Sequence, residues 1–122
     1  MSQKLSATNF LKLVADKRVD EAYTRYVAPN FIHHNAWFKG DRQSLKDAME
    51  LANAQNPDKV IDIKKVIEEG DSVMTFSHVR QRPDDLGGSV VHIFRFENGL
   101  IAELWDLGAP ISKDSPNENG PF

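Results

Sequence analysis

The residue types that could do chemistry converge on one predicted hairpin, which spans residues 90–108 around Asn98-Gly99. This dipeptide favours a type I′ turn, because asparagine and glycine tolerate the positive φ that the turn requires at both central positions. His92 and Asp106 fall on one face of the hairpin, since side chains alternate along a strand. The same face carries Val90, Phe94, Phe96, Ala102 and Leu104. A carboxylate among apolar side chains is costly unless it is paired, protonated or used in a reaction.

The spacing of His92 and Asp106 fits two different roles. If Glu97 pairs with Leu100 across the turn, His92 lies opposite position 105, one step from Asp106. A His–Asp pair in an apolar setting suits general acid/base catalysis, in which the carboxylate takes a proton and the imidazole donates to a developing oxyanion. A buried His–Asp hydrogen bond that only ties two strands together fits the same spacing equally well.

Two other histidines are candidates for the wall of a pocket. His78 lies on a predicted strand whose two faces both carry apolar residues, so it is either a half-buried polar residue or a pocket residue. His34, with Asn35 and Trp37 nearby, could line an opening.

Other site chemistries find little support in the sequence. The HExxH spacing and the G-x-S-x-G elbow are both absent, and nothing forces His33 and His34 to converge with the hairpin pair. We therefore expect no metal ion and no cofactor.

Composition narrows the class of protein further. The 122 residues, with a mass of 13.8 kDa, allow one domain. A net charge of −3 gives no reason to expect nucleic acid as a partner, and the absence of cysteine excludes disulfides and thiolate chemistry. No apolar run approaches the ~18 residues of a membrane span, and the N-terminus lacks the features of a signal peptide. We expect a cytoplasmic protein that contacts neither nucleic acid nor membrane.

Two different spacings of apolar residues along the chain predict the helices and strands that must position these side chains. Helical spacing predicts helices over residues 6–17, from Val19 to before Pro29, and from Asp41 to before Asn56. The expected N-caps are Ser6 or Thr8, Asp20 and Asp41. The segment Phe31–Asn35 is expected to be extended.

From Val60 onward apolar residues recur at every second position, which is the spacing typical of strands. The predicted strands are Val60–Glu68, Ser72–Gln81, Ser89–Glu97 and Leu100–Leu107. Helices followed by an antiparallel meander indicate an α+β fold. Residues 1–108 would form this domain, and residues 109–122 an irregular tail that Phe122 could anchor.

Several short motifs, in this order, resemble the SnoaL-like polyketide cyclase family of the nuclear transport factor two-like superfamily. They are His34-Asn35 followed by a glycine and a helix, residues 69–73 leading into Ser77-His78, residues 93–96 with Asn98-Gly99, residues 101–106, and the tail 117–120 ending in Phe122. The resemblance covers nearly the whole chain. It implies a cone-shaped α+β barrel, with N-terminal helices packed on a curved antiparallel sheet around a pocket.

The resemblance also implies a chemistry. Cyclases of this kind perform an intramolecular aldol condensation without metal or cofactor, and their acid/base aspartate and pocket histidine match Asp106 and His92. Leu104 departs from the pattern, because many relatives carry histidine there, and it makes the pocket more apolar. The chain is also shorter than the true polyketide cyclases, which implies a smaller pocket. The superfamily hosts isomerases, dehydratases and binding domains as well.

We therefore expect a cofactor-independent enzyme of aldol-condensation, isomerase or dehydratase type that acts on a small apolar carbonyl compound. Asp106 and His92 are the expected catalytic residues. The expected substrate-binding residues are His34, His78, Phe94, Leu104 and Trp37. The alternative is a non-catalytic small-molecule-binding or dimeric scaffold domain. A homodimer is expected through the outer sheet face, where Ile101, Trp105 and Val91 would point.

Overall fold

The computed structural model describes residues 2–122, in which three helices precede most of a five-stranded sheet. The elements are α1 (Gln3–Ala15), α2 (Val19–Tyr26), β1 (Val27–His33), α3 (Arg42–Gln55), β2 (Val60–Glu69), β3 (Ser72–Arg80), β4 (Gly88–Glu97) and β5 (Leu100–Pro110). The strand order is β1-β5-β4-β3-β2, with β1 parallel to β5 and all other neighbours antiparallel. This is the α+β architecture that the sequence predicts.

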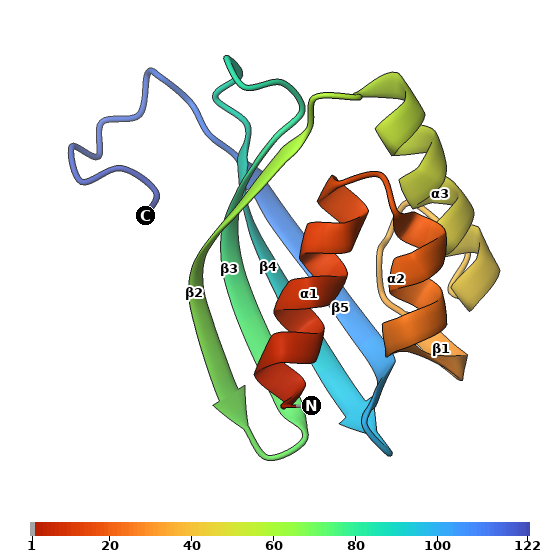
Figure 1. Cartoon of the computed structure of the whole chain (residues 1–122). Helices are drawn as coiled ribbons and strands as arrows, with labels where there is room; N and C mark the ends of the chain where they lie inside the picture. The colour runs from red at the N-terminus through yellow and green to blue at the C-terminus, as the bar shows by residue number, and fades with distance from the viewer. Residues whose placement is uncertain (1) are drawn as a thin grey trace.

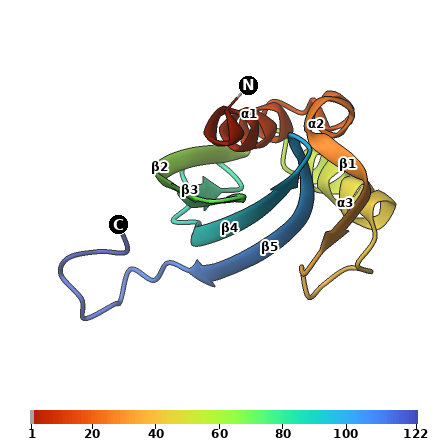
Figure 2. The ribbon, with the colours of Figure 1, turned by 90° about the horizontal axis from the view of Figure 1, so that it is seen from below.

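The sheet is curved, and the helices lie on its hollow side. In Figure 1, α1 crosses in front of the sheet, and in Figure 2 the strongly bent β4 and β5 lie beneath α1 and α2, with α3 beside β1. The core between these layers is aromatic: the Phe10 ring meets the Phe94 ring edge-on at 6.0 Å between centroids, and it also contacts Tyr23. Burial of these large side chains fixes the helices against the sheet. No helix of the described residues is long and apolar enough to cross a membrane.

The helix starts follow local capping chemistry, with two differences from the prediction. Asp41 caps α3 as predicted, since its carboxylate accepts from the backbone N–H of Ser44 at 3.1 Å. Helix α1 begins earlier than predicted and is capped by Ser2, so the predicted caps Ser6 and Thr8 lie inside it. Helix α2 follows Arg18 directly, which places Asp20 in its first turn instead of at the N-cap.

Strand β1 corrects the predicted end of the second helix. The helix ends at Tyr26, and Val27 and Pro29 belong to β1. A proline is tolerated there because β1 is an edge strand of the sheet and needs backbone donors on one side only. Pairing with β5 brings His33 beside Leu104. The loop after β1 therefore begins next to the β4–β5 hairpin.

The hairpin of β4 and β5 turns at Asn98 and Gly99, which both have positive φ, as a type I′ turn requires. Glu97 pairs with Leu100 as predicted, but the register shifts by one residue between Arg95 and Phe96. Beyond this bulge His92 lies directly opposite Asp106 rather than one step away.

The same irregularity corrects the predicted outer face. Ile101 and Ala102 are both buried, and Ile101 belongs to the core instead of facing outward. Trp105 keeps the predicted outward direction, because it pairs with Ile93 next to the inward-facing pair of His92 and Asp106.

The tail follows β5, which continues past Gly108 to Pro110. Residues 111–122 form no helix or strand and extend away from the helices before the C-terminus returns toward the sheet (Figure 2). The Phe122 ring contacts the rings of Phe76 and His78 at 5.3 and 5.0 Å between centroids. Phe122 therefore anchors the tail on the sheet face opposite the helices.

Candidate functional site

A cavity of about 210 Å³ opens between the helices and the end of the sheet where α3 lies. Its walls come from α1, α3, the loop after β1 and the strands β2 to β5, and most of them are apolar. The lining residues are Leu11, Val14, Asn35, Phe38, Leu45, Ala48, Met49, Ala52, Lys59, Ile61, Val79, Val90, His92 and Asp106. An apolar cavity with a few convergent polar groups is the usual form of a small-molecule site.

The predicted pair, His92 and Asp106, lies in the wall of this cavity. His92 Nε2 is 3.9 Å from Asp106 Oδ1, which is too long for a hydrogen bond and short enough for strong electrostatic interaction. Burial lowers the pKa of His92, and the nearby charge of Asp106 opposes this without cancelling it. The imidazole is therefore neutral at neutral pH and can donate one proton without carrying a charge.

Asn35 holds the carboxylate of Asp106 in place. Its Nδ2 donates to Asp106 Oδ2 at 2.9 Å, and its Oδ1 accepts from the backbone N–H of Trp37 at 3.0 Å. The backbone N–H of Asn35 donates to Nδ1 of the buried His33, whose Nε2 lies 2.7 Å from the carbonyl of Lys39. His33 therefore fastens both ends of this loop, and the loop orients Asn35 toward Asp106.

Polar groups also lie on the sheet beside His92. Thr75 pairs with His92 across β3 and β4, and Ser77 follows on the same face of β3. Within the part of the chain that the structure describes, the Thr75 and Ser77 hydroxyls and His92 Nδ1 are buried and lack hydrogen-bond partners. Such groups are costly in a core, and they mark this patch as more polar than folding requires.

Lys59 brings a positive charge to the cavity wall. It lies between α3 and β2, and its side chain is partly buried. Burial lowers the pKa of Lys59, and the charge of Asp106 acts in the opposite direction. The site thus contains a carboxylate, an amide, a neutral imidazole and an ammonium group around one apolar space.

The structure places three predicted pocket residues outside the cavity lining. His34 points to the outer sheet face, where its Nε2 lies 2.6 Å from Glu103 Oε2 and its ring stacks on Trp105 at 4.9 Å. His78 also lies on that face, with Nε2 2.6 Å from the carbonyl of Leu86. Trp37 is 87% exposed.

The cause of these placements is strand alternation. His33 and Ser77 face inward, so their neighbours His34 and His78 must face outward. Phe94 and Leu104 do lie on the inner face, but both are fully buried in the core beneath the cavity and do not line it.

Two polar lining residues, Asn35 and Lys59, were not assigned a role from the sequence. The sequence indicated Asn35 only as a neighbour of His34 at a possible opening and as part of a motif that the resemblance rests on. Lys59 follows a turn that ends a helix and has no distinguishing sequence context. Its position in the cavity depends on how α3 packs.

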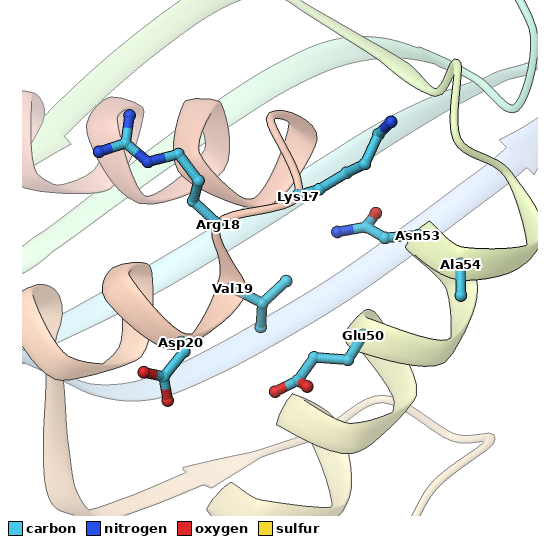
Figure 3. A pocket seen from close by; sticks show the side chains of 7 residues that line it. All are labelled: Lys17, Arg18, Val19, Asp20, Glu50, Asn53 and Ala54. Atoms are coloured by element: carbon cyan, nitrogen blue, oxygen red, sulfur yellow. The ribbon is translucent and has the colours of Figure 1, made fainter.

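A second hollow lies between the α1–α2 turn and α3, as Figure 3 shows. It is lined by Lys17, Arg18, Val19, Asp20, Glu50, Asn53 and Ala54. Its acidic groups are already paired, because Lys46 Nζ lies 3.0 Å from Asp20 and 3.2 Å from Glu50. It lacks a buried acid/base pair, so the cavity at His92 and Asp106 is the stronger candidate site. Among the described residues, no group of three or more His, Cys, Asp or Glu side chains is arranged to hold a metal ion.

Comparison with known proteins agrees with this architecture. The family model of the SnoaL-like domain matches residues 7–104. The chain belongs to the SnoaL-like family. The match begins within α1, runs through α2, α3 and β1 to β4, and ends inside β5, and it confirms the resemblance to this family.

Solved structures of SnoaL-like and related proteins share the fold at low identity. A nuclear transport factor two-like protein of unknown function from Cytophaga hutchinsonii is 15% identical, with a TM-score of 0.74 over 90% of this chain and 92% of that one. A candidate polyketide cyclase from Sinorhizobium meliloti is 14% identical, with a TM-score of 0.71 over 84% and 93%. A candidate SnoaL-like isomerase from Agrobacterium tumefaciens is 14% identical, with a TM-score of 0.73 over 89% and 99%. A search of curated proteins finds no match.

Proposed function

We propose that this SnoaL-like protein is a cofactor-independent acid/base enzyme that acts on a small carbonyl compound. The observation that supports it best is the arrangement of Asp106, whose one oxygen accepts from Asn35 while the other faces the buried His92 at the wall of an apolar cavity. A carboxylate held in this way is positioned to remove a proton from a bound carbon acid. The names of the candidate cyclase and candidate isomerase with this fold are consistent with such a reaction.

The proposed step is proton abstraction next to a carbonyl. Asp106 takes the proton from the α-carbon, the electron pair of the broken C–H bond forms a C=C bond to the carbonyl carbon, and the π pair of the carbonyl moves to its oxygen to give an enolate. Neutral His92 donates a hydrogen bond from Nε2 to that oxygen, and a preorganised donor of this kind is worth about 3–4 kcal/mol in the transition state. The enolate then attacks a second carbonyl, takes a proton at another carbon or expels a β-substituent, which correspond to aldol condensation, isomerisation and dehydration.

The experiment measures exchange of α-protons for deuterium in D₂O, by NMR, with cyclohexanone and acetophenone as probes. We expect exchange above background with the wild type and a loss of about 10²–10⁴-fold in Asp106→Asn, because general-base catalysis contributes rate of that order. Asp62→Asn, which removes a carboxylate outside the cavity lining, is the matched control and should retain exchange.

The fold of Asp106→Asn should survive, because the amide oxygen can still accept from Asn35 and a partly buried charge is removed. If the thermal midpoint of Asp106→Asn equals or exceeds that of the wild type, the carboxylate does not stabilise the fold, which agrees with a catalytic role for Asp106. A loss of about 1–3 kcal/mol would instead support a structural His–Asp pair. Binding of the probes without exchange would support the alternative, a non-catalytic binding domain.

A further inference from the structure

We propose that Lys59 makes this cavity selective for ligands that carry a carboxylate, so that a small oxo acid is preferred over a neutral carbonyl compound of the same size. The inference rests on the proposed function in one respect, namely that this cavity is the ligand site. It goes further by naming the charged group of the ligand and the residue that recognises it.

The first observation is the distribution of charge in the cavity wall. Apart from Asp106 and the neutral His92, Lys59 is the only titratable side chain among the lining residues that the structure describes. The remaining wall is apolar except for the amide of Asn35. A ligand in this space therefore meets a single cation, whose N–H groups are strong donors to an anion.

The second observation is that Lys59 forms no ion pair within residues 2–122, the part of the chain that the structure describes. No carboxylate of the described residues lies within 4.0 Å of its ammonium group. By contrast, ten contacts within this distance pair other Lys, Arg or His side chains with carboxylates, and an eleventh joins His92 to Asp106. Asp106 acts on Lys59 only through space, and its oxygens face Asn35 and His92. Partial burial weakens the hydration of this ammonium group, and an anionic ligand would offset that loss.

The third observation is the separation of the two charges. Because Lys59 and Asp106 face the same cavity without touching, a ligand can lie between them. Its carboxylate would contact Lys59 while its reactive carbon reaches Asp106. The charge at Lys59 also compensates the repulsion between Asp106 and an anionic substrate.

The size of the cavity limits the rest of the ligand. Its volume of about 210 Å³ corresponds to roughly seven water molecules of liquid and lies below the ~300–1,000 Å³ of sites for drug-sized molecules. The apolar wall of Leu11, Val14, Leu45 and Met49 suits one aromatic ring or one branched aliphatic chain.

The test compares phenylacetate with phenylacetamide, two probes of equal size that differ in charge, by calorimetric or NMR titration. We expect the wild type to bind phenylacetate at least about tenfold more tightly, because a hydrogen bond to a charged group is worth about one tenfold step or more in affinity. Lys59→Met should remove this preference, chiefly by weakening the binding of phenylacetate, because it deletes the cation while keeping a side chain of similar length. Lys59→Arg, which keeps the charge, should retain the preference.

The control is Lys65→Met, which removes the same charge from an exposed position outside the cavity lining and should behave as the wild type. A thermal midpoint of Lys59→Met close to that of the wild type shows that this variant is folded. Equal affinity of the wild type for both probes, or a preference that survives in Lys59→Met, would overturn the inference and leave the proposed acid/base function standing. If the wild type binds neither probe, both the inference and the assignment of this cavity fail.

Discussion

His92 is the side chain whose protonation the fold controls most directly. Burial holds its pKa below the ordinary value of 6.5. The unfolded chain therefore binds a proton as the pH falls through about 6.5, while the folded chain does not, and the free energy of unfolding decreases. The free energy of unfolding stops decreasing only when the pH is below the pKa of His92 in the folded chain. Between the two pKa values it falls by at most about 1.4 kcal/mol per pH unit.

Chemical denaturation of the wild type and of His92→Gln, between about pH 7.5 and about pH 5.5, measures this contribution. We expect the wild type to lose more stability over this range than His92→Gln, because the variant lacks the titrating group. His78→Gln is the matched control, since that ring lies on the outer face and bonds to the carbonyl of Leu86. Equal pH dependence in the wild type and His92→Gln would contradict the burial argument.

Among single residues, the sequence correctly predicted that His92 and Asp106 lie together on the inner face, but it placed His34, His78 and Trp37 in the pocket wall, where the structure does not have them. His92 and Asp106 could be identified because alternation along two strands places both among core residues. Alternation also requires His33 and His34 to face opposite ways, but which of them faces inward depends on the pairing of β1 with β5. Lys59 could not be recognised, because only tertiary packing brings the segment after α3 to the cavity.

The β4–β5 hairpin determines how His92 and Asp106 face each other. A substitution in its turn tests how much the turn contributes to the stability of the hairpin. Gly99 has a φ of +79°, and a Cβ added there would meet no atom within 4 Å, so any effect of a side chain is purely conformational. We expect Gly99→Ala to lower the free energy of unfolding by about 1–2 kcal/mol, because a residue with a Cβ is strained in the left-handed region.

Equilibrium denaturation of Gly99→Ala checks this value. Gly40→Ala is the control, because Gly40 has no positive φ and an added Cβ there would lie 3.5 Å from the His33 carbonyl, an ordinary contact. The control should change stability by much less. A Gly99→Ala protein as stable as the wild type would mean that the turn relaxes and does not fix the hairpin.

Elements were predicted well wherever an apolar period or a turn dipeptide specified them. The four long strands and the three helices follow the predicted order, and their ends differ by a few residues. The bulge opposite Ile101 and Ala102 was not predicted, because either residue is apolar enough for the core and alternation cannot choose between them. The bulge nevertheless sets the site, since it turns a diagonal approach of His92 and Asp106 into a direct pair.

The outer face of the sheet is the feature that concerns the whole molecule. Two cross-strand rows of apolar side chains cross β3, β4 and β5 on this face. One row is Phe76, Val91 and Leu107, and the other is Met74, Ile93 and Trp105. A polar network of Arg95, Glu103 and His34 borders the second row, and Phe122 contacts the first. An apolar centre with a polar rim is typical of protein interfaces.

We propose that the chain forms a two-fold homodimer through this face, as expected from the sequence. The residues on the face differ in one respect, because Ile101 is buried in the core and Ile93 and Leu107 contribute to the face instead. A continuous apolar patch on a curved sheet is unfavourable in water, and a second copy of the same surface would cover it symmetrically. Leu107 is 62% exposed at the end of the first row, so a charge there would be buried without a partner in a dimer and would remain solvated in a monomer.

Light scattering on a sizing column at micromolar concentration tests the proposal. We expect the wild type to show twice the chain mass of 13.8 kDa, and Leu107→Lys to show the single chain mass with its helical content unchanged. Leu51→Lys is the matched control, because Leu51 on α3 is similarly exposed, at 58%, and lies away from the sheet. It should remain dimeric. A wild type of 13.8 kDa, or a Leu107→Lys protein that still has twice that mass, would show that this face is not the interface.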